Sequence, residues 1–187
     1  MTATRLHLWG RLSSINVRKV VLCAQWLGLE LPRSDAGLSY GVVDTPAYRA
    51  MNPNGLVPVL QDGDFTLWES NAILRYLCER EGRGMPADLR IRADTNRWLD
   101  WQQTTLNRAS GPAFVQWIRT PAERRDIAAI EASVRASEPL FEWLDAHLAQ
   151  RPYMAGDTVS FPADRPHSYE NPGSSESRYH NVILYER

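Results

Sequence analysis

The apolar residues of the first third of the chain change from a strand period to a helix period. Leu6 and Leu8 stand two positions apart in residues 5–10, which predicts a short strand that ends at Gly10. The apolar residues that follow recur at helical spacing, at Val17, Val20, Val21, Ala24 and Leu27. Ser and Asn precede this helix and Gly28 follows it, so the chain opens as strand, tight loop and helix.

The next segment is irregular and then becomes strand-like again. Residues 32–48 show no long period, and their glycines and prolines favour a weak strand followed by an irregular, mobile segment. Two short apolar runs then flank "DGD" at residues 62–64, which predicts a β-hairpin. A helical pattern follows the hairpin. The order expected for the first half is therefore β-α-β-α-β-β-α.

The second half of the chain is helical in its pattern. Trp98, Trp101, Thr105 and Leu106 fall near one face of a long stretch that Gly111 and Pro112 are expected to interrupt or kink. A second long helix follows, with apolar residues at steps of three, four and seven: Ile127, Ile130, Val134, Phe141, Leu144 and Leu148.

These patterns predict an α/β domain over residues 1–84 and an all-helical domain over residues 85–160. Residues 161–187 are rich in Ser, Asn, Pro and Tyr, with no amphipathic period before a short apolar run near the end. We expect them to form an atypical, poorly ordered tail.

Composition narrows the classes of function. The net charge of −1 over 187 residues provides no general attraction to nucleic acid or to an anionic membrane. The two cysteines, Cys23 and Cys78, form neither a disulfide framework nor a metal motif, and small buried thiols are expected. The chain shows no secretory signal and no apolar run of the roughly 18 residues that a membrane span needs, so we expect a cytoplasmic location.

Pro58 stands between Val57 and Val59 in a run that otherwise has the pattern of a strand. Proline has no N–H to donate to a sheet, so it occurs at edges, bulges or breaks. With a trans bond, Pro58 would be an ordinary edge-strand proline. A cis bond, which is common only before proline, would turn the Val57 N–H and C=O towards a peptide ligand.

Glu69 and Ser70 fall where the second hairpin strand ends and the next helix begins. A helix N-terminus binds carboxylates, Ser70 adds a hydroxyl donor, and Glu69 can pair with an ammonium group. Together they suit an α-amino acid group, which carries both charges. Simple capping, with Ser70 as the N-cap and Glu69 next to the helix dipole, is the alternative.

Ser13, Ser14 and Asn16 cluster in the loop that leads into the first helix. A hydroxyl or amide there can donate to an anion, and the helix N-terminus would favour the thiolate form of a ligand thiol. Capping is again the alternative, because Ser and Asn are common caps. All three features can converge at one end of a small sheet.

Two stretches carry a family resemblance. "NPNGLVPVLQDGDFTLWESNAILRYL" and "LWGRLSSINVRKVVLCAQWLGLE" resemble the thioredoxin-like domain of cytosolic glutathione transferases, and "RWLDWQQTTL" looks like part of their all-helical domain. The resemblance points to bacterial members with theta-like and nu-like patterns. It implies glutathione as co-substrate and no metal. It also implies that the Val57–Pro58 bond is cis, that Val57 pairs with the cysteinyl part of glutathione, and that Glu69 and Ser70 hold its γ-glutamyl end.

The resemblance also implies the activating residue. The theta-like pattern S-x-P-x-R-x-V and the bacterial pattern T-P-N both place the activating hydroxyl at Ser14, and the second places an assisting amide at Asn16. A zeta-like alignment would favour Ser13 instead. We predict that Ser14 is catalytic and Asn16 assists. Trp101, Gln102 and Thr105 are predicted walls of a second-substrate pocket, with ordinary helix packing as the alternative.

The implied reaction is attack of the glutathione thiolate on a hydrophobic electrophile to give a thioether. A glutathione-dependent disulfide reductase or peroxidase would use the same thiolate. An interaction module of the same fold without catalysis is the alternative from another class. The family resemblance further implies a homodimer.

Two departures from the family pattern stand out. Theta-like members have a lysine for the glycyl carboxylate where this chain has Leu56, so Asn54 and the loop "SYGVVDT" are the candidates here. The family's late capping box begins with Gly156, Asp157 and Ser160 and is then interrupted by Pro162. We therefore expect a truncated or frame-altered C-terminus and an incomplete helical domain.

Overall fold

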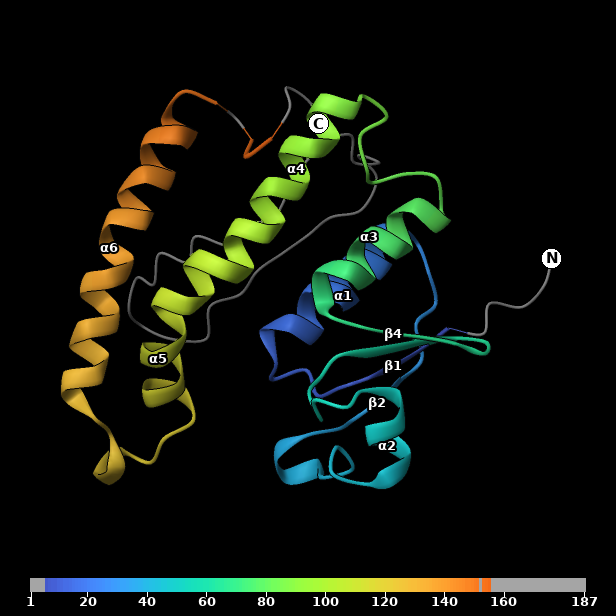
Figure 1. The fold of residues 1–187 in the computed structure, drawn as a ribbon, viewed down its shortest axis with the longest axis horizontal. Helices are drawn as coiled ribbons and strands as arrows, with labels where there is room; N and C mark the ends of the chain where they lie inside the picture. The colour runs from blue at the N-terminus through green and yellow to red at the C-terminus, as the bar shows by residue number, and fades with distance from the viewer. Residues whose placement is uncertain (1–5, 152, 156–187) are drawn as a thin grey trace. The chain divides into compact units, whose positions relative to one another are not determined.

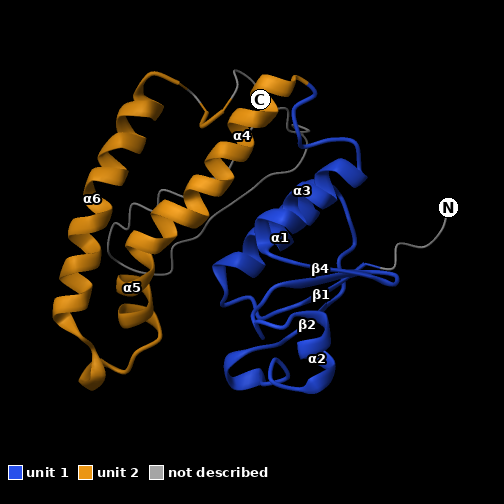
Figure 2. Cartoon of the chain, in the orientation of Figure 1, with its two compact units in different colours: residues 1–87 blue, residues 88–187 orange. Residues whose placement is uncertain are grey.

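The computed structural model describes residues 6–151 and 153–155, and the chain divides into two compact units, residues 1–87 and 88–187 (Figure 2). The first unit contains the mixed α/β part, and the regular elements of the second unit are helices over the residues that the structure describes. The late capping box at Gly156, Asp157 and Ser160 and the tail over 161–187 lie outside the described residues.

The first unit is built on one four-stranded sheet with the strand order β2-β1-β3-β4 (Figure 1). β1 pairs with β2 in parallel and with β3 antiparallel, and β3 and β4 form the expected hairpin. The predicted order β-α-β-α-β-β-α is confirmed, with a 3₁₀ turn before the second helix. The elements are β1 (Leu6–Trp9), α1 (Ile15–Trp26), β2 (Arg33–Ser34), η1 (Leu38–Tyr40), α2 (Pro46–Met51), β3 (Val59–Asp62), β4 (Phe65–Trp68) and α3 (Ser70–Arg80).

Both faces of this sheet are covered. Leu8 and Leu60 point to the face that packs against α1 and α3, whereas Val59, the neighbour of Leu60, points to the opposite face. Tyr48 of α2 and Ala36 pack there with Val59. Figure 1 shows α1 and α3 on one side of the strands and α2 on the other. Successive strand residues therefore contribute to two separate cores, as the pleat requires.

Gly10 allows three elements to meet where β1 ends. Its φ is +148°, and a Cβ at this position would lie 2.5 Å from a Val17 methyl group and 3.2 Å from the Val57 Cβ. A side chain would therefore push α1 away from the strand. The glycine brings the start of α1 close to the segment that precedes β3.

Up to residue 151, the described part of the second unit folds into helices, in agreement with the predicted helical region. Asp88 caps α4 by accepting from two backbone N–H groups, and Asp126 caps α6 by accepting from the Ala129 N–H. Trp98 and Leu144 are the buried centre of this unit. The elements are α4 (Leu89–Trp101), the π-helical segment η2 (Gln102–Leu106), α5 (Asn107–Ile118), η3 (Ala122–Arg124) and α6 (Ile127–Ala149).

Gly111 and Pro112, which were expected to interrupt or kink the helix, do not interrupt it. Both residues lie inside α5, and the departure from α-helical geometry falls earlier, in η2. A side chain of α6 explains why α5 continues. The Ser133 hydroxyl accepts from the Ala113 N–H at 3.1 Å and donates to the Ala109 carbonyl at 2.5 Å. Ser133 thus inserts into the helical hydrogen bond next to Pro112 and satisfies both of its ends.

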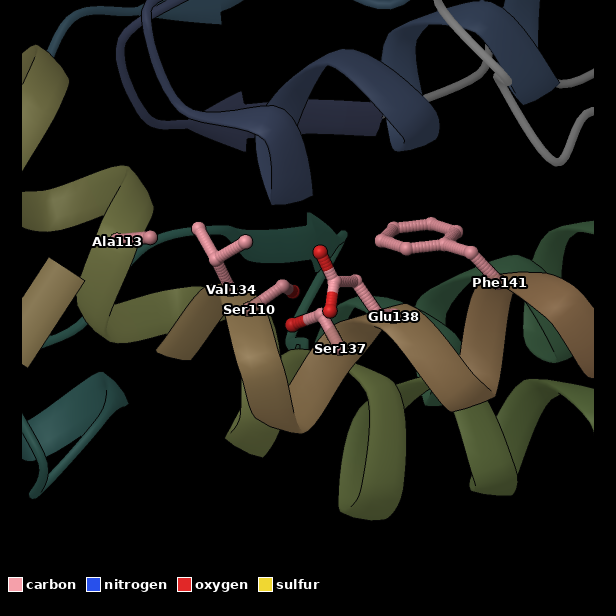
Figure 3. Close-up of a pocket in the computed structure, with 6 residues that line it drawn as sticks. All are labelled: Ser110, Ala113, Val134, Ser137, Glu138 and Phe141. Atoms are coloured by element: carbon pink, nitrogen blue, oxygen red, sulfur yellow. The ribbon is translucent and has the colours of Figure 1, made fainter. Parts of the chain in front are cut away.

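The apolar stripe predicted for α6 divides into two faces. Ile130 and Leu144 are buried with the small residues Ser133 and Ser137, which let α5 approach closely. The four apolar residues spaced by seven remain 40–55% exposed: Ile127, Val134, Phe141 and Leu148. Val134, Glu138 and Phe141 line a hollow of about 190 Å³ together with Ser110, Ala113 and Ser137 (Figure 3).

Two further features concern membrane and metal binding. None of the helices within the described residues has both the length and the apolar character that crossing a membrane would need. Within the same part of the chain, no three or more His, Cys, Asp or Glu side chains gather as a metal site would require.

Candidate functional site

Ser14 lies at the start of α1, and its side chain does not cap the helix. It is the N-cap residue, with φ −89° and ψ 123°, yet its hydroxyl makes no capping hydrogen bond. Its carbonyl begins the helix by accepting from the Val17 and Arg18 N–H groups. Ser14 is 5% exposed, whereas Ser13 is exposed. The capping interpretation of the Ser14 hydroxyl is therefore wrong.

The start of α3 lies beside the start of α1. The Ser70 hydroxyl donates to the Asn16 Oδ1 at 3.4 Å, across 54 positions of sequence. Ser70 is buried and is the first residue of α3, so Glu69 and not Ser70 is the N-cap residue. The structure thus brings Asn16 and Ser70 together, with Ser14 two residues before Asn16.

Glu69 has an unusual backbone conformation. It is the N-cap residue of α3 with φ +71°, and its side chain makes no capping hydrogen bond. Non-glycine residues in this region are strained by about 1–3 kcal/mol, and such residues cluster at ligand sites. The Glu69 side chain is exposed. Its carboxylate is therefore available for a cationic ligand group.

A lysine that the sequence analysis missed connects the same two helices. The Lys19 Nζ donates to the Asn71 Oδ1 at 2.6 Å. Burial lowers the pKa of Lys19 from 10.5 to about 8; attraction to Glu69 opposes this shift, and repulsion from Arg75 adds to it. One signal was visible in the composition, because Lys19 is the single lysine among 21 basic residues and all the others are arginine.

The Val57–Pro58 peptide bond is cis, as the family resemblance implies. The ladder between β1 and β3 ends at the Trp9–Val59 pair, so Val57 lies just beyond it. The preceding carbonyl, that of Leu56, accepts from the Tyr48 hydroxyl and from the Asn52 amide, each at 2.9 Å. These two hydrogen bonds fix the backbone that leads into the cis bond.

The side chains next to this bond differ from the expectation for a glycyl carboxylate site. Leu56 is 63% exposed and carries no charge. The Asn54 N–H and its Nδ2 both donate to the Asn52 Oδ1, at 3.0 and 3.1 Å. The Asn54 amide therefore also stabilises the turn over residues 52–55. Asn52 and Tyr48 were missed as supports of this segment. The "NPNG" turn motif was the signal for Asn52.

The predicted second-substrate residues lie in the second unit. The Trp101 ring packs on Trp98 and Trp143, with centroid separations of 5.6 and 5.3 Å. Trp101 is thus partly used in packing between α4 and α6. Gln102 is half-buried and Thr105 exposed, and both belong to the π-helical segment η2. π-helical segments often occur at functional sites.

Comparison with known proteins gives consistent matches. Residues 4–79 match the family model "Glutathione S-transferase, N-terminal domain". Glutathione S-transferase GstB of Escherichia coli strain K12 is 43% identical over 159 residues, which cover 81% of this chain and 75% of the relative. Human glutathione S-transferase theta-2 is 31% identical over 166 residues, 83% of this chain and 66% of the relative.

A solved structure of a glutathione S-transferase also matches this chain. The theta class glutathione S-transferase of Xanthomonas axonopodis pv. citri, solved with glutathione bound, superposes with a TM-score of 0.80 at 39% identity. The match covers 88% of this chain and 87% of that protein. This fold and this degree of identity define a thioredoxin-like domain followed by a helical region. The chain belongs to the glutathione S-transferase family.

Proposed function

We propose that this chain is a glutathione transferase that binds glutathione in its first unit and stabilises the glutathione thiolate at Ser14. The observation that carries the proposal is the meeting of the two helix starts, where the Asn16 amide contacts Ser70 and the nearby Ser14 hydroxyl makes no capping bond. Helix N-termini attract anions, so a thiolate and a carboxylate both suit this place.

The γ-glutamyl end of glutathione fits the start of α3. Its α-carboxylate would accept hydrogen bonds from the first N–H groups of α3 and from Ser70. Its α-ammonium group would pair with the exposed carboxylate of Glu69. The strained backbone of Glu69 supports this role, because a capping carboxylate would not need it.

The cysteinyl part would pair with the Val57 backbone, as one more short strand beyond the end of the ladder. Pro58 makes this possible because the cis bond directs the Val57 peptide groups away from the strand that follows. For the glycyl end we keep Asn54 and residues 39–45 as candidates. The Asn54 amide also donates to Asn52, so it would offer only part of its hydrogen-bonding capacity to the glycyl end.

The reaction follows from a thiolate held beside Ser14. The Ser14 hydroxyl donates a hydrogen bond to the sulfur, the thiol proton leaves to solvent, and the sulfur lone pair attacks an electrophilic carbon. A thioether forms as the leaving group departs with its electron pair. Each unit by which the thiol pKa falls corresponds to about 1.4 kcal/mol in favour of the thiolate.

The second substrate is proposed to be a hydrophobic small-molecule electrophile. Trp101, Gln102 and Thr105 are proposed to contact it, with the exposed Thr105 and half-buried Gln102 offering polar groups beside the Trp101 ring. We also propose that the chain acts as a homodimer, following its family.

The test is a pair of serine variants. Ser14→Ala is expected to lower kcat for conjugation of a chloronitrobenzene by about a hundredfold, while the KM for glutathione changes little, because only the thiolate loses a donor. Ser13→Ala is the matched control, since Ser13 is exposed and adjacent. Loss of activity in Ser13→Ala with normal Ser14→Ala kinetics would contradict the assignment.

A further inference from the structure

A half-buried lysine of α1, Lys19, contacts α3, and these two helices carry the proposed glutathione site. Lys19 follows Ser14 by just over one turn of α1, and its Nζ contacts Asn71, which directly follows Ser70 in α3. The charged groups that act on it are Glu69, at the start of α3, and Arg75, further along the same helix. Lys19 therefore contacts the residue that directly follows Glu69 and Ser70, which are proposed to hold the γ-glutamyl end.

Placing an ammonium group here is unfavourable for folding. Burial penalises the charged form, and the pKa of Lys19 falls to about 8 although Glu69 attracts it. A methionine would fill a similar volume without this penalty. Every other cation of the chain is an arginine, whose charge does not titrate near neutral pH. A costly lysine at this position is typical of a functional site rather than of packing.

We propose that Lys19 is a positioning residue for glutathione: through Asn71 and Glu69 it holds the start of α3 in the geometry that receives the γ-glutamyl end. The inference rests on the proposed function. The hydrogen bond fixes the Asn71 side chain, and the Lys19 charge attracts the carboxylate of Glu69, the residue with the strained backbone. The positive charge also favours the ligand's α-carboxylate.

This role makes glutathione affinity depend on pH. Lys19 is charged below pH 8 and loses its charge as pH rises through 8. If the charged form binds the ligand about tenfold more tightly, binding must raise the pKa of Lys19 by about one unit, because linkage is reciprocal.

The single lysine allows a direct test. Protein grown with lysine labelled with ¹³C at Cε has one such signal, which can be titrated with and without S-methylglutathione, whose blocked thiol cannot titrate. The expected result is a pKa for Lys19 near 8 in the free protein, raised by about one unit in the complex. An unchanged or lowered pKa in a complex that does form would overturn the inference.

Variants provide a second measurement. Lys19→Met should weaken S-methylglutathione binding about tenfold at pH 7 by calorimetry, and the difference from wild type should vanish near pH 10. Arg18→Met, which removes an exposed charge from the neighbouring position, should bind as wild type does. Lys19→Arg should bind more tightly than Lys19→Met at both pH values.

The outcomes separate the two proposals. If wild-type protein does not bind S-methylglutathione, the proposed function fails and this inference fails with it. If wild type binds and a folded Lys19→Met binds equally well, only the role of Lys19 is overturned. If Lys19→Met does not fold, the titration of the labelled wild-type protein decides alone.

Discussion

At the scale of single residues, the candidate site combines side chains that contribute little to the stability of the fold. Glu69 occupies a strained conformation without capping α3, and Ser14 occupies a cap position without using its hydroxyl as a cap. Simple substitutions at either position would make the folded state more stable. Residues that serve binding at the expense of stability are a common feature of functional sites.

Glu69→Gly should therefore separate stability from function. Glycine adopts φ +71° without strain, so the free energy of unfolding should rise by about 1 kcal/mol in urea titrations, while glutathione binding is lost. Glu69→Gln is the control, because it keeps the backbone strain and removes only the charge. A glycine variant that is less stable and binds normally would contradict the role given to Glu69.

The sequence pointed to Ser14, Glu69, Ser70 and Pro58 as site candidates, because they stand at element boundaries and in stretches that resemble the family. Lys19 could not be found in this way. Its properties arise from burial between two helices and from a contact 52 positions away in the chain. Local patterns carry no information about such a long-range contact.

At the scale of elements, α5 and α6 depend on each other through the backbone of α5. Pro112 donates no hydrogen bond, and the Ser133 hydroxyl is inserted between the Ala113 N–H and the Ala109 carbonyl. The sequence predicted an interruption or a kink at Gly111 and Pro112 because those residues weaken an isolated helix. The compensating group lies on another helix, so the continuation of α5 was beyond local prediction.

Ser133→Ala should destabilise the protein by about 2 kcal/mol, because two half-buried backbone groups lose their partner. Ser137→Ala provides a matched control. The Ser137 hydroxyl donates only to the Ser133 carbonyl of its own helix, so its loss should cost less than about 1 kcal/mol. Urea unfolding of both variants measures the difference, and equal effects would refute the bridging role.

At the scale of the whole molecule, the chain joins an α/β unit with the proposed glutathione site to a unit whose described elements are helices and which carries the proposed electrophile residues. The α/β order was predictable because each element has its own hydrophobic period and turn signals. The division of α6 into a buried and an exposed apolar face was not, since the buried face includes Ser133 and Ser137, which do not belong to the apolar pattern. Packing between α5 and α6 therefore determines which face of α6 is buried.

The central claim is that bound glutathione is a thiolate because of Ser14. The most direct measurement is the ultraviolet absorbance of the thiolate in the glutathione complex, titrated with pH in wild type and in Ser14→Ala. Wild type should lower the pKa of the bound thiol by about two units relative to free glutathione, and Ser14→Ala should bind glutathione with a nearly normal thiol pKa. Bound glutathione that titrates like free glutathione in the wild-type protein would contradict the account.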